Sequence, residues 1–512
     1  MTSIWKTGRR DGAAESAPVE VADRVFEVAI VGAGITGLAT ALMLLRAGRN
    51  VVVVEAREVA ALASGANTGK AALLQGDRLR RIRRAHSARV TRAYVEANLD
   101  GQRWIADTAR ELGVPFGLEP EYSYAQTPEG LDAVDGEYDA AREAGLPVER
   151  IGRMPAGFPF EGAVVLADQL ALDPVRLADA LAAEFLALGG TLLTGVTVTG
   201  VHASDPAEVV TTHGTIRADD VVVATAAPIL NRGLYFAKTR HSRSYLSAFR
   251  GAGLAVPGLY LSVDSPGRSI RTTPDPAAAA TDAAPLLIVG GGAHAVGRAT
   301  SPAAGVREYE DWTREHFPGA ERVASWSAQD YISANLVPFV GRMPRGNGRI
   351  WVATGYAKWG LTNGVAAAIR IASEILGSPW REQRSWIRVL GTRVTVPSDL
   401  GRGAAENAAV ARELAKGWAG VQLHPAPARK PAEGEGVVVS RGGVPYGVST
   451  VEGRTCAVRA VCTHLGGVLR WNDAEASWDC PLHGSRFEAS GRRIEGPAVR
   501  DLPTAERSPR HS

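Results

Sequence analysis

Cysteine is scarce in this 512-residue chain, which contains only three, and this scarcity excludes a scaffold held together by disulfides. A strong charge of one sign is also lacking, because the formal net charge is only +3. We therefore expect no binding of nucleic acid through a general electrostatic attraction. Residues 1–23 lack the apolar run of a signal peptide, so the sequence predicts a soluble, cytoplasmic protein whose cysteines are free for metal binding.

One uncharged stretch, residues 29–45, has the composition of a membrane span. It contains Gly32, Gly34 and Gly37 at the spacing of a turn, however, and this pattern favours a buried strand followed by a helix. We therefore expect no membrane span.

The glycine-rich turn has the pattern of a dinucleotide-binding site. It follows an apolar strand at 26–31 and precedes an apolar helix, and the next strand ends at Glu55. Gly32 permits the tight turn, Gly34 lets the backbone approach a pyrophosphate, and Gly37 allows the helix to pack closely on the strand. The N–H groups at the start of the helix favour phosphate, and Glu55 is placed to bind a ribose hydroxyl. The pattern predicts NAD or FAD binding; a glycine turn without a ligand is the alternative.

Three further segments decide between the two cofactors. Residues 63–70, 218–226 and 350–364 resemble the D-amino-acid-oxidase-like FAD oxidoreductases, the family of glycine and sarcosine oxidases, and no second fingerprint for a separate NAD site occurs. The resemblance implies that these segments approach the flavin and that a backbone amide at 195–196 meets the adenine. The predicted FAD-binding residues are Gly32, Gly34, Ile35, Thr36, Gly37, Glu55, Ser64, Gly65, Thr68, Val196, Thr225, Gly355, Lys358, Trp359, Gly360 and Thr362.

Two short segments near the C-terminus each contain one cysteine and one histidine. Cys462 and His464 form a C-x-H pair, and Cys480 and His483 form a C-x₂-H pair. Two thiolates and two imidazoles suit a [2Fe–2S] cluster in which two histidines replace two cysteines on one iron. A zinc site is the alternative, although zinc fingers usually pair Cys with Cys and His with His. The segments resemble the Rieske signature, and short flanking strands predict a small antiparallel domain.

The cluster loops depart from one branch of the Rieske proteins. The cytochrome bc type carries an extra cysteine in each loop, and Gly467 and Leu482 stand at those places here. The loops therefore resemble Rieske ferredoxins and oxygenase Rieske domains, which implies a reduction potential in the lower part of the Rieske range. Cys456 is expected to be a small buried strand residue.

The predicted fold class is an α/β FAD-binding domain of the Rossmann-like, doubly wound type with an α+β substrate subdomain, followed by a small all-β Rieske domain. We expect a flexible N-terminal tail over 1–25 and the FAD-dependent oxidoreductase over 26–395, with its substrate subdomain at about 235–330. A helical and proline-rich linker over 396–425 then leads to the Rieske domain over 426–505.

The chain as a whole resembles FAD-dependent amine-type oxidoreductases with a C-terminal Rieske domain, through residues 268–272, 290–297, 326–331 and 357–360. One departure lies at 335–338, where Asn-Leu stands in place of an expected Asp-Gly. The resemblance implies oxidation of a C–N bond in an amine or amino acid, transfer of electrons from FAD to the cluster, and an external acceptor such as a ferredoxin, cytochrome or quinone.

Four side chains are candidates for a direct role in catalysis. Lys358 could stabilise the anionic edge of reduced flavin or contact the substrate. Arg268 or Arg271 could bind a substrate carboxylate through two N–H groups, and His294 could orient the substrate or exchange a proton. The structural alternatives are a surface lysine, arginines in ion pairs and a histidine held by a glycine turn.

Other functions remain open at this point. The cluster could deliver electrons to FAD for a reduction, or the protein could be an electron-transfer relay or sensor. A Rieske oxygenase would need a further iron held by two histidines and a carboxylate, and the remaining histidines form no close H-x₃₋₅-H pair. The basic run 78–84 is expected to be a solvated helix face, with an acidic redox partner as the alternative.

Overall fold

The computed structural model describes residues 1–7, 9, 24–278, 284–379, 381–391, 397–423 and 430–504. The glycine-rich turn lies in its first sheet, whose central strands are parallel. The strands of this sheet are β1 (Val25–Val31), β2 (Val51–Val54), β7 (Thr191–Leu193), β8 (Val198–His202), β9 (Ala207–Thr211), β10 (Gly214–Val223), β16 (Phe339–Arg342) and β17 (Ile350–Thr354). Their order is β16-β17-β10-β1-β2-β7, and β9 pairs with both β8 and β10.

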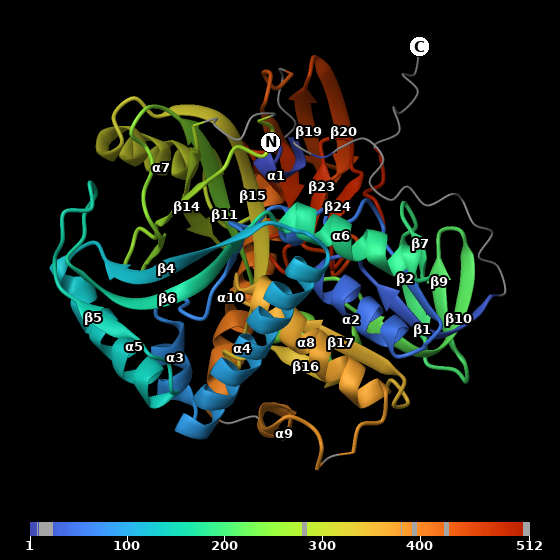
Figure 1. Ribbon diagram of the computed structural model, residues 1–512. Helices are drawn as coiled ribbons and strands as arrows, with labels where there is room; N and C mark the ends of the chain where they lie inside the picture. Colours follow the sequence, from blue (N-terminus) through green and yellow to red (C-terminus); the bar gives the residue numbers. More distant parts are fainter. Residues whose placement is uncertain are drawn as a thin grey trace.

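Apolar residues on both faces explain how this sheet is buried. β2 consists of four buried valines, as expected for a parallel strand that is covered on both sides. One face packs against helices and the other against the β8–β9 hairpin (Figure 1). The covering helices are α2 (Ile35–Arg46), α4 (Ala88–Glu111), α6 (Pro174–Ala187) and α8 (Gly360–Ile375).

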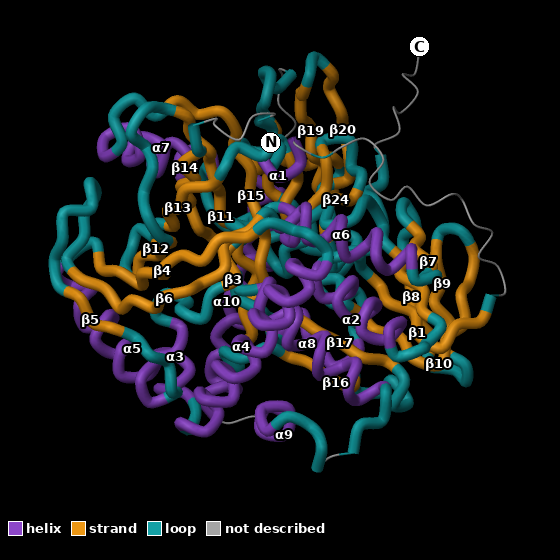
Figure 2. The backbone as a smooth tube through the Cα atoms, viewed as in Figure 1, coloured by secondary structure: helices purple, strands orange, loops and turns teal. Residues whose placement is uncertain are grey.

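A second, nine-stranded sheet stands beside the first (Figure 2). Its strands are β3 (Lys70–Ala71), β4 (Phe116–Ala125), β5 (Glu149–Ile151), β6 (Gly162–Leu172), β11 (Thr239–Arg250), β12 (Leu259–Ser262), β13 (Ser269–Thr273), β14 (Leu286–His294) and β15 (Glu321–Ser333). The order is β15-β11-β14-β13-β12-β4-β6-β3, with β5 added to β6.

The predicted range of the substrate subdomain, 235–330, is therefore too short. β4 and β6 lie outside it, and they join the sheet through the parallel pairing of β4 with β12, in which Glu121 stands opposite Leu259. This pairing links segments that are far apart in the sequence, so local patterns do not announce it.

Short helices complete this part of the chain: α3 (Arg78–Ala85), α5 (Leu131–Glu143), α7 (Pro302–His316), α9 (Ser385–Gly391), and the 3₁₀ turns η1 (Ala63–Gly65), η2 (Pro128–Gly130) and η3 (Arg232–Ala237). The basic run forms α3, but it is not simply a solvated face. Arg78 is buried and donates to the Leu336 carbonyl oxygen, while Arg80 and Arg83 form ion pairs with Asp132 and Glu143 on α5. The acidic partner of these arginines lies in the chain itself.

The C-terminal domain consists of two small antiparallel sheets. The first contains β18 (Gly436–Arg441), β19 (Val444–Val451) and β20 (Arg454–Arg459), and the second contains β21 (Arg470–Asn472), β22 (Ser477–Asp479), β23 (Arg486–Glu488) and β24 (Arg493–Glu495). Trp478, Phe487 and the two cluster cysteines belong to a shared core. Cys456 is partly buried on β20, close to the expected strand position.

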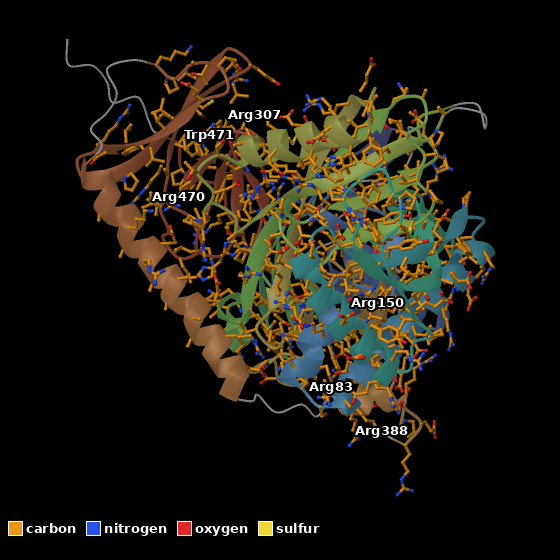
Figure 3. The ribbon with its side chains drawn as sticks, turned by 90° about the vertical axis from the view of Figure 1, so that its left-hand side faces the viewer. Arg83, Arg150, Arg307, Arg388, Arg470 and Trp471 are labelled. Carbon is orange, nitrogen blue, oxygen red and sulfur yellow. The ribbon has the colours of Figure 1, made fainter. Side chains whose placement is uncertain are left out.

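A long helix, α10 (Pro397–Leu423), runs along the edge of the molecule to this domain, close to the labelled Arg470 and Trp471 (Figure 3). Its Glu413 pairs with Arg470, and its Trp418 indole donates to the Gly466 carbonyl oxygen at 3.1 Å. The helical part of the predicted linker is therefore packed against the domain that it joins. Most of the proline-rich part lies outside the described residues.

The first residues of the predicted flexible tail also differ from the expectation. They form a short helix, α1 (Ile4–Thr7), in which Trp5 is only 2% exposed and its indole N–H donates to the Asn67 carbonyl oxygen at 2.8 Å. The aromatic side chain anchors this segment because it fills an apolar cluster with Val175 and Trp326. Residues 10–23 of the predicted tail lie outside the described residues.

Candidate functional site

The glycines of the first turn are required by its close packing. A Cβ atom on Gly37 would lie 1.9 Å from the Gly32 carbonyl oxygen, so any side chain there would push the helix from the strand. Gly32 itself has φ +111° and packs against the backbone of Ala224. α2 then begins after Gly34; Gly34, Ile35 and Thr36 border a cavity, and the Ile35 N–H donates to the Ser64 hydroxyl at 3.1 Å. This arrangement fits the phosphates of a dinucleotide.

Glu55 lies at the end of β2, where the sequence placed it. Its carboxylate accepts hydrogen bonds from the backbone N–H groups of Ala33 at 2.8 Å and Arg57 at 2.9 Å, and burial raises its pKa. The remaining lone pairs of the carboxylate are those available to a ribose hydroxyl. Val196 lies alongside, but its N–H donates to the Glu55 carbonyl oxygen at 2.9 Å. The amide predicted to contact the adenine therefore already donates a hydrogen bond within the protein.

A single cavity extends from the start of α2 to the second sheet. Nine of the predicted FAD-binding residues border it: Gly34, Ile35, Thr36, Ser64, Thr68, Gly355, Lys358, Trp359 and Gly360. The other seven, Gly32, Gly37, Glu55, Gly65, Val196, Thr225 and Thr362, lie behind this wall or beyond it. Thr362, for example, donates its hydroxyl to Asn98 at 2.6 Å in the core. The predicted set thus divides into cavity-lining residues and residues that shape the backbone.

The turn before α8 has an unusual backbone. Gly355, Ala357 and Lys358 all have positive φ values, of +86°, +52° and +78°. Left-handed backbone costs about 1–3 kcal/mol at a residue other than glycine, and such strain gathers at functional sites. The turn delivers the uncapped start of α8 to the cavity, where its dipole favours negative charge such as that of a reduced flavin. Lys358 Nζ donates to the Ser244 hydroxyl across the cavity wall.

The other three catalytic candidates have structural partners. Arg271 is buried and donates to the carbonyl oxygens of Thr68 and Thr272, and it does not border the cavity. Arg268 borders the cavity, but its guanidinium pairs with Glu308 and lies over the Trp312 ring. His294 lies outside the wall, with Nδ1 on the Gly292 carbonyl oxygen at 3.0 Å; desolvation by burial lowers its pKa. Of the four, only Lys358 brings an exposed charged group to the cavity.

The strands β11 and β15 form the wall between the cavity and the C-terminal domain. Because side chains alternate along a strand, their even-numbered residues, such as Ser244 and Asp330, face the cavity. Their odd-numbered side chains reach the other side: Gln329 Nε2 donates to the Gly484 carbonyl oxygen at 2.8 Å, and Arg243 pairs with Glu475 at 2.6 Å. A single layer of sheet therefore separates the cavity from the cluster loops.

The four predicted cluster ligands come together at the tips of two loops. Cys462 and Cys480 are 3% and 2% exposed, and the rings of His464 and His483 lie 5.2 Å apart. Both histidines have a buried Nδ1 atom without a hydrogen-bond partner, which is the atom a metal would take. The set therefore fits a [2Fe–2S] cluster.

All three cysteines are free in the structure. Gly467 and Leu482 stand where the bc-type cysteines were expected, and a Cβ on Gly467 would lie 2.7 Å from the Leu482 side chain. Apolar contact between the two loops replaces the covalent link. A hydrogen bond from the Cys480 thiol, together with the backbone N–H groups of His464 and Leu465, lowers the pKa of Cys462 to about 7.

The histidine side of the cluster site faces the FAD-binding part of the chain. His464 Nε2 lies 3.0 Å from the side-chain oxygen of Asn231, and Phe236 contacts both histidine rings edge-on. Both residues belong to the segment that follows β10, whose end borders the cavity. The cluster ligands are thus held against the same scaffold as the cavity.

A buried network of charged side chains connects the FAD-binding part of the chain with the C-terminal domain. Arg243 of β11 contacts Glu475 and Glu495, and Arg486 contacts Glu475 at 2.5 Å and Asp479 at 3.0 Å. Three carboxylates thus share two guanidinium groups, and burial raises the pKa of Glu495 to about 6. Removing one of the two guanidinium groups from this network would leave buried carboxylates without compensation, so the arginines help to hold the domains in one relative position.

The sequence analysis missed several residues of this arrangement, notably Gln329, Asp330, Asn231 and Phe236. Gln329 and Asp330 stand in a motif that was noted only for its resemblance. The sequence signal that could have indicated Gln329 and Asp330 is the succession of polar residues in a strand that is covered on both faces. It identifies a two-sided wall but not what lies on each side.

This fold and these two sites define an FAD-dependent oxidoreductase that carries a Rieske domain. The model of the FAD dependent oxidoreductase family matches residues 27–374, and the chain belongs to this family. The Rieske [2Fe-2S] domain model matches residues 424–506. The predicted fold class and both predicted cofactors, FAD and a Rieske [2Fe–2S] cluster, are confirmed.

Known proteins resemble the chain as a whole and in part. The Rieske 2Fe-2S iron-sulfur protein YhfW of Bacillus subtilis (strain 168) is 28% identical over 512 residues, which cover 98% of this chain and 96% of that protein. Glycine oxidase from Geobacillus kaustophilus shares the fold, with a TM-score of 0.58 and 21% identity over 70% of this chain and 96% of that one.

The cluster loops have their own relatives. The cytochrome b6-f complex iron-sulfur subunit 1 of Nostoc sp. (strain PCC 7120 / SAG 25.82 / UTEX 2576) is 51% identical over 45 residues, 9% of this chain and 25% of that protein. We had expected these loops to resemble ferredoxin and oxygenase Rieske domains, and the similarity to a cytochrome b6-f subunit does not follow that expectation. No helix among the described residues has the length and apolar character of a membrane span.

Proposed function

We propose that this protein is a dehydrogenase that oxidises a C–N bond of an amine or amino acid and passes the electrons through FAD and the Rieske cluster to an external acceptor. The observation that carries the proposal is the shared wall: β11 and β15 line the cavity with one face and contact the cluster domain with the other. A cluster that lies one sheet away from the flavin cavity is close enough to accept electrons from the reduced flavin.

In the proposed reaction, the cavity holds FAD and the substrate, and the loops of the C-terminal domain hold the cluster. Bound FAD would supply the hydride acceptor: the carbon next to the substrate nitrogen would lose a hydride and the nitrogen would lose a proton to solvent. The resulting imine takes up water and yields a carbonyl compound and an amine or ammonia. Within the chain, the start of α8 and Lys358 favour negative charge at the cofactor, while the wall shapes the substrate space. A [2Fe–2S] cluster held by the two cysteines and two histidines of the loops would take one electron at a time, so a two-electron oxidation would need two successive transfers.

Gln329 supports a specific route between the centres. Gln329 is among the residues that border the cavity, and its side-chain amide donates to the Gly484 carbonyl oxygen, one residue from the predicted ligand His483. Only covalent bonds and one hydrogen bond separate the cavity wall from the ligand loop along this path. On the other side, Leu465 next to His464 is 45% exposed, which leaves the loop tip open to an external acceptor such as a ferredoxin, cytochrome or quinone.

The test is an anaerobic titration of the holoenzyme with a panel of amines and amino acids, followed by visible absorption and low-temperature EPR. We expect at least one compound to bleach the flavin and to produce the EPR signal of a reduced Rieske cluster. The same geometry also suits the reverse direction. If no compound on the panel reduces either centre, and a protein or chemical donor reduces the cluster before the flavin, the dehydrogenase proposal is wrong and the reductive function replaces it.

A further inference from the structure

We propose that Asp330 binds the positively charged amino group of the substrate, so that the cavity selects a cationic amine. This inference rests on the proposed function, and it names the substrate class. It comes from the position of Asp330 and from the charges that surround the cavity.

Asp330 occupies the cavity face of the wall. It lies on β15 opposite Ser242 of β11, two residues beyond Ala328, which also borders the cavity. Its neighbours in sequence, Gln329 and Tyr331, direct their side chains to the cluster domain. The alternation of the strand therefore requires the Asp330 carboxylate to point toward the substrate space.

The carboxylate has no partner of its own among the residues that the structure describes. Asp330 Oδ1 is buried without a hydrogen bond, and no salt bridge includes this residue. Burial is the main influence on its pKa and raises it. A buried carboxylate oxygen without a donor is costly, and a charge-assisted N–H bond from a bound ligand would relieve that cost.

Of the other three charged side chains that border the cavity, Lys70 and Arg268 are engaged by acidic partners, whereas Lys358 donates to the neutral Ser244 hydroxyl. Lys70 donates to the Tyr260 carbonyl oxygen and pairs with Glu121, and Arg268 pairs with Glu308. These partners hold both cations, so a substrate carboxylate finds neither of them free.

Three cations lie within electrostatic reach of Asp330, and none of them forms a salt bridge with it. Lys358 donates to Ser244, Arg78 donates to the Leu336 carbonyl oxygen, and Arg240 is exposed. They help to keep the carboxylate ionised, which an ammonium ligand requires, but their hydrogen bonds go to other atoms. Asp330 is therefore a cavity-facing carboxylate whose Oδ1 has no hydrogen-bond donor among the described residues.

The experiment uses three probes of one shape and different charge: tert-butylamine, tert-butanol and pivalate. None has a hydrogen on the carbon next to its polar group, so tert-butylamine can bind without being oxidised. Binding to the holoenzyme is measured by calorimetry. We expect tert-butylamine to bind more tightly than the other two, and Asp330→Asn to weaken it by about tenfold to a hundredfold. Asp330→Glu, which restores the charge, should recover part of this preference.

Controls separate binding from folding. Asp311→Asn removes one carboxylate from the exposed face of α7 and should leave all three affinities unchanged. The flavin absorption and the cluster EPR signal of Asp330→Asn should match those of the wild type. The inference is overturned if the wild type binds tert-butylamine no better than pivalate, or if Asp330→Asn binds tert-butylamine as tightly as the wild type.

The outcome is independent of the test of the dehydrogenase itself. If tert-butylamine binds through Asp330 but no oxidisable amine bleaches the flavin, the site stands and the proposed function fails. If amines bleach the flavin and Asp330→Asn binds tert-butylamine normally, the proposed function stands and this inference fails.

Discussion

The phosphate cradle and the β11–β15 wall are two kinds of functional site in one molecule. The cradle is built from neighbours in sequence: Gly32 and Gly37 meet within one strand–turn–helix unit, and its purpose is visible in a short stretch of residues. The wall is built from strands whose meaning depends on what packs against each face. Gln329 and Asp330 are adjacent in sequence, yet one faces the cluster domain and the other faces the cavity. A local motif thus reveals a cofactor site, whereas the position of one cofactor site beside the other depends on tertiary packing.

The largest effect should come from breaking the cradle. Gly37→Val places a branched side chain where even a Cβ would lie 1.9 Å from the Gly32 carbonyl oxygen. We expect α2 to be displaced and FAD binding to be lost, which the flavin absorption of the purified protein would measure. The cluster EPR signal should persist, because the Rieske domain has its own core. A variant with normal flavin content would contradict the packing argument.

A smaller but more specific effect should come from the wall. Gln329→Leu keeps the volume of the side chain but removes its hydrogen bond to the Gly484 carbonyl oxygen. We expect electron transfer from reduced flavin to the cluster to slow several-fold, with flavin reduction by substrate unchanged, as measured by anaerobic stopped-flow absorption. Thr313→Val, which removes a buried hydroxyl of α7 away from the wall, is the matched control. Equal transfer rates in Gln329→Leu and the wild type would remove Gln329 from the route.

The charge network between the domains predicts a dependence of stability on pH. Burial raises the folded-state pKa of Glu495 from 4.5 to about 6, so the folded state binds more protons than the unfolded state between these values. The contribution of Glu495 is therefore fully present below pH 4.5 and is lost as pH rises through about 6. Glu495→Gln should remove this loss and stabilise the protein at neutral pH by about 1–2 kcal/mol.

Urea unfolding of the wild type and Glu495→Gln at several pH values measures this difference. The two stabilities should converge toward pH 4.5 and separate above pH 6. A constant difference across the range would show that the carboxyl group does not titrate as its burial implies.

The smallest expected effect concerns the contact of Asn231 with a cluster ligand. His464 Nε2 lies 3.0 Å from the Asn231 side-chain oxygen, and an acceptor there makes the imidazole a stronger donor to iron. Asn231→Leu should therefore destabilise the oxidised cluster and raise its reduction potential slightly, as measured by EPR-monitored redox titration. Asn347→Leu, at another exposed loop, should leave the potential unchanged. A lowered potential in Asn231→Leu would contradict this reasoning.

Local chemistry explains which parts of the site could be predicted from the sequence. The predicted cluster ligands lie in two loops of a few residues each: Cys462 and His464 in one, Cys480 and His483 in the other. Two cysteines and two histidines are the ligand set of a Rieske cluster. The cavity-lining turn at 355–360 was also predicted, because its glycines and the following helix form one continuous segment. Arg271 and His294 were predicted to act in catalysis, but neither borders the cavity. Residue type alone does not tell which face of a strand a side chain occupies.

The sequence by itself indicated the two cofactors, the order of the two domains and the predicted ligands of the cluster, because each depends on residues that are close together along the chain. Only the tertiary structure decided that β4 and β6 complete the second sheet and that Arg268 and Lys70 form ion pairs with acidic residues. It further decided that Asp330 Oδ1 is buried without a hydrogen-bond donor. It also decided that the cluster lies one sheet away from the cavity. These features arise from contacts between distant segments, and such contacts form only when burial of apolar surface brings the segments together.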